Sequence, residues 1–249
     1  MFGTHYRLER KSIVLAVAIM VVASIGGLIE IAPLFTIDET VETDPDMRVY
    51  TPLELAGRNI YIREGCYACH SQMIRTLQDE VERYGPYSLA VESKYDHPML
   101  WGSKRTGPDL ARVGGKYSDQ WHAAHLRNPR DVVPESIMPR YPWLDETPLH
   151  TSHLGDDLRA LRKVGVPYTD DMIANASADA VAQASPDDDT AGLVERYGDA
   201  TQIRAFDGDQ RTVSEMDALV AYLQILGKLS TVPHQAAATT PVVPPVTER

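Results

Sequence analysis

Both cysteines of this chain, Cys66 and Cys69, are separated by only two residues, and His70 follows them directly. Such a C-x-x-C pair can be a redox-active dithiol, half of a zinc site, or the attachment point of a c-type haem. Zinc would need two further ligands at short spacing, and the chain has no other cysteine. A dithiol enzyme would place the pair in a βαβ unit, a pattern that this sequence lacks. Haem attachment is the favoured interpretation, with a dithiol or a chance pair as the alternatives.

The spacing of these residues has a direct geometric meaning. Cysteines at positions i and i+3 lie on one turn of a helix, so their sulfur atoms can reach the two vinyl groups along one haem edge. A histidine at the next position can turn its imidazole under the ring and bind the iron. Cys66, Cys69 and His70 therefore predict one covalently bound haem c with His70 as an axial iron ligand.

The sixth iron ligand must come from the opposite face of the haem, and a methionine would suit electron transfer because its thioether raises the haem potential. Met73 is too close in sequence to His70 to pass around the ring. Met99, Met138, Met172 and Met216 remain. Of these, Met172 and Met216 fall in expected helices, where packing explains them. Met138 lies in the proline-rich loop "PESIMPRYPWL", which can present a thioether at a fixed place. We therefore expect Met138 to be the second axial ligand.

His70 also needs a partner for its other ring nitrogen, to fix its tautomer and orientation. The stretch "RTGPDLARVGGKYS" contains a Gly-Pro-x-Leu turn. In small c-type cytochromes such a turn lies against the histidine, where a backbone carbonyl accepts the N–H and the leucine packs on the ring. Pro108 and Leu110 match that turn, and an ordinary surface turn is the alternative. His122 and His125 are expected on a short helix in surface or packing roles.

A long apolar run precedes all of these motifs. No charged residue occurs from Ile13 to Ile29, and extension to Phe35 would let a helix cross the roughly 30 Å hydrocarbon layer of a membrane. The run is too long for a cleaved signal peptide, and no convincing cleavage site follows it. We expect an uncleaved anchor, with Glu30 near the outer interface facing water or a partner subunit.

The charges on either side of the anchor predict its orientation. Arg7, Arg10 and Lys11 precede the run, whereas acidic residues follow between Asp38 and Asp46. Positive flanks remain in the cytoplasm, so the rest of the chain is expected on the outer side of a bacterial inner membrane. The formal net charge of −11 argues against nucleic acid as a partner, because phosphate binding needs a basic footprint.

Two amphipathic helices are expected on either side of the haem motif. Thr51 to Glu54 forms a capping box with proline at the first helical position, and the helix that it opens runs toward Cys66. A second cap at Ser214 precedes an apolar stripe that runs to Leu226. Two such helices can pack on each other and enclose a haem, and Gly57 would permit a close crossing.

Several blocks together resemble subunit II of cbb3-type cytochrome c oxidase, the mono-haem FixO/CcoO subunit. The likeness runs from the anchor to about residue 229 and rests on these segments: "GRNIYIREGCYACHSQMIRT", "WGSKRTGPDLARVGGKYSDQWH", "HLRNPRDVVPESIMPRYPWL", "GVPYT" and "SEMDALVAYLQILG". It implies a bacterial haem–copper oxidase in which a separate catalytic subunit reduces oxygen and a dihaem cytochrome c subunit is the usual electron entry. It also implies haem roles for Cys66, Cys69, His70 and Met138.

The chain itself has no nucleophile–base constellation and no copper site, so oxygen chemistry is expected in another subunit. We therefore expect an electron-transfer subunit that contacts the catalytic and dihaem subunits, membrane lipid and, as a possible donor, a soluble cytochrome c. The alternatives are a free-standing membrane-anchored electron shuttle, or a haem-based redox or gas sensor in which a ligand displaces Met138.

The expected fold is all-α, with a single N-terminal transmembrane helix and a class I cytochrome c-like domain with extra loops and helices. The aspartate-rich stretch 185–212 shows no complete calcium-binding loop pattern and is expected to be a solvated face. The expected segments are a cytoplasmic N-terminus 1–11, an anchor 12–35, a linker 36–50, a mono-haem cytochrome c domain 51–229 with an acidic insertion at about 145–212, and a disordered proline-rich tail 230–249.

Overall fold

The computed structural model describes residue 6 and residues 9–35, 44–102 and 104–232. These residues form helices and connecting loops without a β-strand, which confirms the all-α prediction for the part of the chain that is described. The chain divides into two compact units, Met1–Glu42 and Thr43–Arg249. Most of the expected N-terminal segment 1–11, part of the expected linker, and the expected tail from 233 onward lie outside the described residues.

The first unit consists of helix α2, Ser12–Ile31, continued by the 3₁₀ helix η1, Ala32–Phe35. None of the α2 residues is buried, although the helix is apolar on all sides. By length and composition α2 could cross a membrane. Twenty residues at 1.5 Å each span about 30 Å, which matches a hydrocarbon layer. This helix coincides with most of the expected anchor 12–35.

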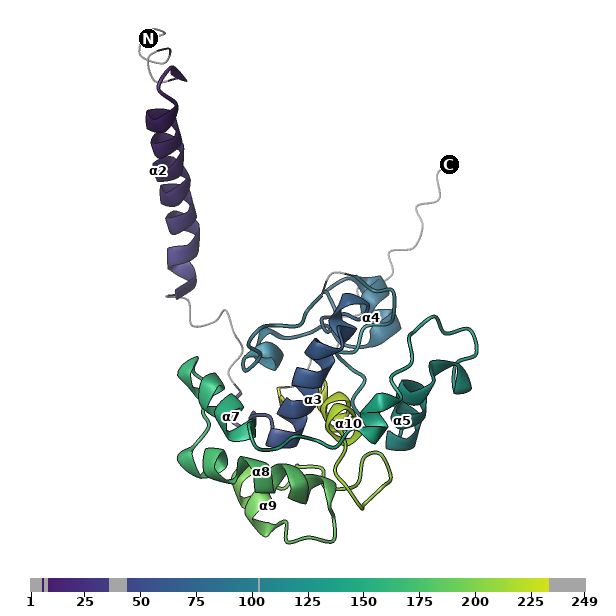
Figure 1. Cartoon of the computed structure of the whole chain (residues 1–249). Helices are drawn as coiled ribbons and strands as arrows, with labels where there is room; N and C mark the ends of the chain where they lie inside the picture. Colours follow the sequence, from purple (N-terminus) through teal and green to yellow (C-terminus); the bar gives the residue numbers. More distant parts are fainter. Residues whose placement is uncertain (1–5, 7–8, 36–43, 103, 233–249) are drawn as a thin grey trace, which may run out of the picture. The chain divides into compact units, whose positions relative to one another are not determined.

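The second unit is built from short helices joined by long loops (Figure 1). Its elements, in chain order, are α3 Pro52–Arg63, η3 Cys66–Ala68, α4 Gln78–Tyr84, η4 Ala90–Ser93, α5 Asp119–Arg127, η5 Pro129–Asp131, α6 Trp143–Glu146, α7 Leu154–Lys163, α8 Asp170–Ala184, α9 Ala191–Tyr197 and α10 Glu215–Ile225.

Helices α3 and α10 begin at the two predicted caps. The Thr51 hydroxyl accepts a hydrogen bond from the Glu54 backbone N–H, and the Glu54 carboxylate accepts one from the Thr51 N–H. Ser214 and Asp217 form the same reciprocal pair at the start of α10. Each pair satisfies backbone donors that the first helical turn leaves free. Both helix starts are therefore fixed by local sequence.

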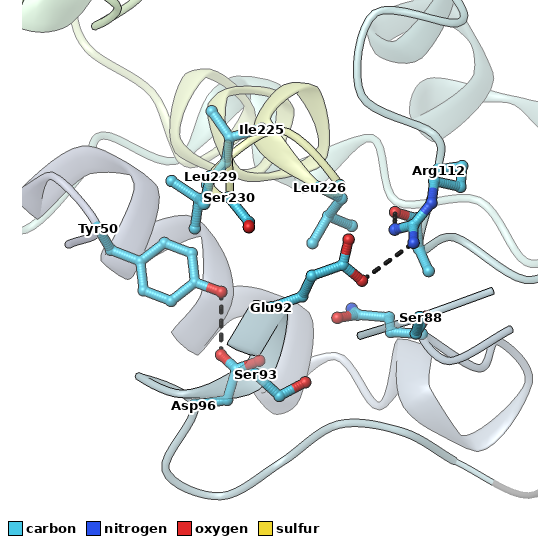
Figure 2. A pocket seen from close by; sticks show the side chains of 13 residues that line it. Tyr50, Ser88, Glu92, Ser93, Asp96, Arg112, Ile225, Leu226, Leu229 and Ser230 are labelled. Atoms are coloured by element: carbon cyan, nitrogen blue, oxygen red, sulfur yellow. Dashed lines mark hydrogen bonds and ion pairs between the residues drawn. The ribbon is translucent and has the colours of Figure 1, made fainter. Parts of the chain in front are cut away.

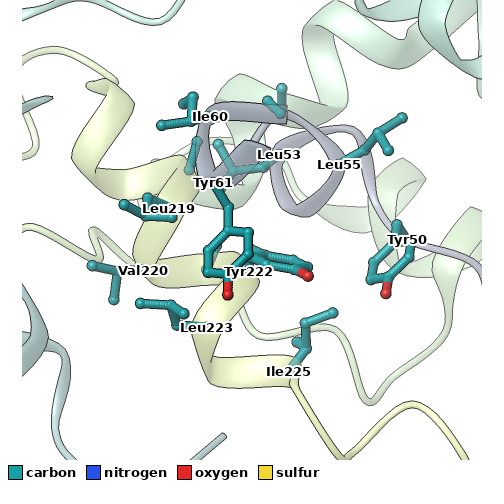
Figure 3. Packing of buried hydrophobic residues seen from close by; sticks show 14 of the residues in the cluster. Tyr50, Leu53, Leu55, Ile60, Tyr61, Leu219, Val220, Tyr222, Leu223 and Ile225 are labelled. Carbon is teal, nitrogen blue, oxygen red and sulfur yellow. The ribbon is translucent and has the colours of Figure 1, made fainter. Parts of the chain in front are cut away.

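The crossing of α3 and α10 forms the centre of the second unit. A Cβ atom on Gly57 would lie 1.9 Å from the Ala218 carbonyl oxygen, so only glycine permits this approach. Tyr222 packs beside the crossing, with its ring centroid 5.7 Å from that of Tyr61 (Figure 3). The buried cluster around the crossing includes Leu53, Leu55, Ile60, Leu219, Val220, Leu223 and Ile225.

The expected acidic insertion is a folded part of the second unit. Helix α8 packs against α7, α9 and α3. Its buried Gln183 accepts a hydrogen bond from the Thr51 hydroxyl at 2.5 Å and donates one to the Gln202 carbonyl at 3.1 Å. The helices α7 to α9 therefore brace the start of α3. Asp156 in α7 and Asp187 in the loop after α8 are exposed, whereas Asp179 in α8 is buried.

The beginning and the end of the described second unit are tied together. The buried Asp44 carboxylate accepts hydrogen bonds from the Ser230 hydroxyl and the Thr231 backbone N–H, both at 2.7 Å. Burial alone would raise the pKa of Asp44, but these hydrogen bonds outweigh it and hold the pKa below its usual value. Residues 44–50, placed in the expected linker, thus belong to the folded unit.

A small polar cavity of about 40 Å³ lies between η4 and the end of α10 (Figure 2). On its wall, the Tyr50 hydroxyl donates a hydrogen bond to the Asp96 carboxylate at 2.9 Å. Arg112 donates one to Glu92 at 3.0 Å. The volume is enough for an ordered water molecule. This cavity is separate from the one that contains the predicted haem residues.

Candidate haem site

A second, much larger cavity of about 600 Å³ contains all the predicted site residues in its wall. Cavities of roughly 300–1,000 Å³ are typical of cofactor sites. The predicted residues that line it are Cys66, Cys69, His70, Pro108, Leu110 and Met138. The structure thus brings together residues that lie up to 72 positions apart in the sequence.

The two cysteines lie at the short helix η3, which packs against the end of α3. Gly65 precedes them with φ of 73°, a conformation that favours glycine. The backbone N–H of His70 donates to the Cys66 carbonyl at 2.9 Å, which keeps the motif in one turn. Cys66 is half-buried and Cys69 is exposed, and both are free thiols.

The protonation of Cys66 bears on the dithiol alternative. Burial, together with the nearby Glu64 carboxylate, raises the pKa of this thiol to about 11. A redox-active dithiol normally has one thiol with a lowered pKa, because the thiolate is the reactive form. The burial of Cys66 therefore disfavours a role for this thiol as a dithiol nucleophile.

His70 is oriented by the Gly107–Pro108 turn, which lies against its ring. Its Nδ1 atom lies 2.8 Å from the Pro108 carbonyl oxygen. Because a carbonyl only accepts, Nδ1 must carry the proton, which leaves the Nε2 lone pair for a metal. A Cβ on Gly107 would lie 2.3 Å from His70 Cε1, so this glycine makes room for the ring. The N–H of Gly107 also donates to the Cys69 carbonyl at 2.9 Å, which joins the turn to the cysteine motif.

An arginine that the sequence interpretation did not single out braces this wall. Arg105 donates to the Ser71 hydroxyl at 2.7 Å, to the Met73 carbonyl at 2.8 Å and to the Glu80 carboxylate at 2.8 Å. Asp109 accepts a hydrogen bond from the same Ser71 hydroxyl at 2.6 Å. These contacts join the residues after His70 to the turn that orients it.

Met138 lies on a different part of the wall, in the loop between η5 and α6. Its backbone N–H donates to the Ser136 hydroxyl at 3.2 Å. The loop is tied to α5 through the Tyr141 N–H, which donates to the Leu126 carbonyl at 2.8 Å. Met99, by contrast, is half exposed, and Met216 is fully buried in the core. Among the described methionines, Met138 lines the large cavity.

Helix α5 contributes a feature that the sequence interpretation missed. His122 and His125, given surface or packing roles, both line the cavity. Burial lowers the pKa of His122 to about 4, and burial together with the charge of His70 lowers that of His125. Their position after Ser118 at i and i+3 could have placed both on one helix face, but not on a cavity wall.

These residues fit a haem. The cavity offers two thiols at one place, an imidazole whose Nε2 is available, and a thioether on another part of the wall. Apolar side chains such as Leu126, Leu219 and Leu223 line much of the remainder, which suits a porphyrin ring. The described residues contain no cluster of histidine, cysteine and carboxylate ligands that would hold a free metal ion.

Comparison with known families decides the assignment. Residues 5–230 match the family described as cytochrome c oxidase, mono-heme subunit/FixO. The chain belongs to the FixO family. As a FixO subunit it carries one haem, takes part in electron transfer and associates with other subunits of a cytochrome c oxidase. The resemblance seen in the sequence is confirmed, and an apolar N-terminal helix agrees with membrane anchoring of a FixO subunit. No curated protein matches the chain.

Proposed function

We propose that this chain is the membrane-anchored mono-haem cytochrome c subunit of a cbb3-type oxidase. Its covalently attached haem c would pass electrons to the subunit that reduces oxygen. The observation that carries the proposal is the single cavity that gathers Cys66, Cys69, His70 and Met138. The FixO assignment supplies the oxidase context.

Each residue has a role that follows from its chemistry. Cys66 and Cys69 would form the thioether bonds, and His70 and Met138 would bind the iron. The Pro108 carbonyl holds the His70 ring, and Leu110 would pack on the haem. When bound, the haem supplies a one-electron ferric–ferrous couple. The apolar wall excludes water, and a thioether ligand raises the potential.

The partners and orientation follow from the same assignment. We propose contacts with the catalytic haem–copper subunit and with a dihaem cytochrome c subunit, and electron supply from that subunit or from a soluble cytochrome c. The basic residues Arg7, Arg10 and Lys11 would keep the N-terminus in the cytoplasm, so the haem domain would lie on the periplasmic side of a bacterial inner membrane.

The attachment chemistry is tested by staining for haem peroxidase activity on the denatured chain. Wild-type protein should stain, because thioether bonds survive denaturation. Cys66→Ala and Cys69→Ala should each weaken the stain, and the double variant should abolish it. Met99→Leu serves as the control and should stain like wild type. An unstained wild-type chain would disprove the cytochrome assignment.

Gentle detergent extraction separates this proposal from a free-standing electron shuttle. The tagged chain should co-purify with a large haem–copper subunit and with a second c-type cytochrome. Recovery of the chain as a lone cytochrome, under conditions that keep other respiratory complexes intact, would contradict the subunit assignment.

A further inference from the structure

A buried carboxylate directly follows the residue that orients His70. Asp109 comes after Pro108 in the turn that lies against the imidazole, and its side chain is buried. None of the proposed haem roles uses this carboxylate. A buried charged group is costly unless it is paired and hydrogen-bonded, so the partners of Asp109 indicate what it holds in place.

Three hydrogen-bond donors within 3.0 Å of the Asp109 carboxylate come from its own turn and from the segment after His70. One oxygen accepts from the Ser71 hydroxyl at 2.6 Å and from the Met73 backbone N–H at 3.0 Å. The other oxygen accepts from the Ala111 backbone N–H at 2.8 Å. Asp109 therefore fastens its turn to the chain immediately after the proposed iron ligand.

The direction of the hydrogen bond at Ser71 follows from its two partners. The Nε atom of Arg105 lies 2.7 Å from the same hydroxyl oxygen, and a guanidinium can only donate. The Ser71 hydroxyl therefore accepts from Arg105 and gives its single proton to the Asp109 carboxylate. Because the hydroxyl is engaged on both sides, Ser71 is a fixed link between the two segments.

The charges around this link balance one another. Arg105 forms ion pairs with Glu80 at 2.8 Å and with Asp109 at 3.4 Å, and Glu80 is also paired with Arg75. Two cations thus face two carboxylates. The group adds little net charge beside the haem cavity, so its influence on a haem acts mainly through geometry.

That geometry reaches His70 through a single peptide group. The carbonyl of Pro108 and the backbone nitrogen of Asp109 belong to the same planar peptide. The carbonyl oxygen lies 2.8 Å from His70 Nδ1. The next backbone N–H, that of Leu110, donates to the Ser71 carbonyl at 2.8 Å. Anchoring Asp109 therefore fixes the direction in which the Pro108 carbonyl points.

We propose that Asp109 is a positioning residue for the haem iron. By holding Ser71, it fixes the peptide that presents the Pro108 carbonyl to His70, and so sets the donor strength of the imidazole. This inference rests on the proposed function, because it requires His70 to bind the iron. A hydrogen bond from Nδ1 makes the imidazole a stronger base, and a stronger donor favours ferric over ferrous iron. Loss of the Asp109 contacts should therefore weaken that bond and raise the midpoint potential.

The first test variant is Ser71→Ala, because it breaks the link to Asp109 without changing any charge. Ser230→Ala is the matched control. The Ser230 hydroxyl donates to the buried Asp44 carboxylate at 2.7 Å, and neither of these residues lines the large cavity. The second variant, Asp109→Asn, keeps the shape of the side chain, but its amide nitrogen cannot accept, so at least one donor loses its partner.

The readout is the Nδ1–H group of His70 itself, in the full-length haem-loaded chain in detergent. Proton–nitrogen NMR of the ferrous form, with isotopically labelled histidine, detects this group directly. Ser71→Ala should move its proton resonance upfield and speed its exchange with solvent by roughly fivefold, the factor that one ordinary hydrogen bond is worth. Asp109→Asn should change both in the same direction, and both variants should raise the midpoint potential. Ser230→Ala should match wild type in all three measurements.

A His70 Nδ1–H resonance identical to wild type in both Ser71→Ala and Asp109→Asn would overturn the proposal. An equal shift in Ser230→Ala would overturn it as well, because it would show a general loosening of the fold instead of a specific contact. These outcomes are read on chains that keep the covalent haem stain. Absence of the stain from wild-type protein would instead refute the proposed function.

Discussion

At the scale of single residues, Gly107 determines whether His70 can face the cavity. A methyl group there would lie 2.3 Å from Cε1 and 2.8 Å from both ring nitrogens of His70. Gly107→Ala should therefore displace the imidazole and reduce haem content several-fold, measured as Soret absorbance per mole of chain. Gly192→Ala is the control, because its added methyl meets only the flexible end of Arg196. Equal haem content in the two variants would contradict this role of Gly107.

Met138 carries the other half of the proposed iron coordination. Met138→Leu should remove the weak red-edge absorption band of an iron–thioether bond and open the sixth position to small ligands. Met138→His could restore six-coordination but should lower the potential. Met99→Leu and Met216→Leu should leave the spectrum unchanged, because near-isosteric swaps usually cost less than about 1.5 kcal/mol. Loss of the band in Met99→Leu, with its retention in Met138→Leu, would show that the ligand is wrongly assigned.

Residues of the site differ in how far the sequence could predict them. Cys66, Cys69 and His70 lie within five consecutive positions of the chain, so their spacing alone indicates haem attachment. The role of Gly107 and the cavity position of His122 depend on atoms that lie far away in sequence and near in space. Local pattern cannot show that a glycine hydrogen faces an imidazole, or that a histidine faces a cavity instead of solvent.

At the scale of elements, the crossing of α3 and α10 depends on Gly57. Gly57→Ala gains about 1 kcal/mol of helix propensity. Its methyl would, however, lie 1.9 Å from the Ala218 carbonyl oxygen, which no rotamer change can relieve. We expect a net loss of about 2 kcal/mol or more in the free energy of unfolding, in line with overpacked cores. This loss is measured by denaturant unfolding monitored by circular dichroism.

Gly155→Ala in α7 provides a graded comparison for the same measurement. Its methyl would lie 2.9 Å from the Ile173 carbonyl oxygen, a milder conflict than that at Gly57. It should therefore destabilise the protein less. If Gly57→Ala were as stable as wild type, the close approach of the two helices would be wrong.

The hydrogen bonds around Arg105 predict that the stability of the protein depends on pH in the acid range. Hydrogen bonds from Arg105, aided by Arg75, lower the pKa of Glu80 from its ordinary 4.5 to about 2. A lowered carboxylate pKa adds stability that is complete above about pH 4.5 and is lost as the pH falls toward 2. Glu80→Gln should flatten this dependence in thermal unfolding measured across that range. Glu82→Gln on the same helix, which bonds to Gln78 at the surface, should retain the wild-type slope.

Helix boundaries show what local sequence can and cannot specify. The caps at Thr51 and Ser214 and the helix after Ser118 were predicted because their signals lie within four residues. The docking of α8 on the start of α3 was not, since it depends on a hydrogen bond between Thr51 and Gln183, which are 132 positions apart. The aspartate-rich composition predicted only a solvated surface. It gave no indication of the alanine and leucine faces with which these helices pack on their neighbours.

At the scale of the whole molecule, the proposed orientation can be tested without the haem. A reporter that is active only outside the cytoplasm, fused after Thr51 in place of the haem domain, should be active. The same reporter fused after Arg10 should be inactive, because it would remain on the basic side of the anchor. Activity from a cytoplasm-only reporter at Thr51 would reverse the topology.

The packing of α3 on α10 also determines when the haem domain can fold during synthesis. Helix α3 leads directly into the cysteine motif, yet its packing surface is completed by Glu215–Ile225, almost the last described part of the chain. A chain that is still being synthesised therefore presents Cys66 and Cys69 before the cavity can close around a haem. We expect stable holoprotein to form only after the chain is complete. Chains truncated before α10, for example after Thr212, should then yield no stable cytochrome. They should be degraded by proteases.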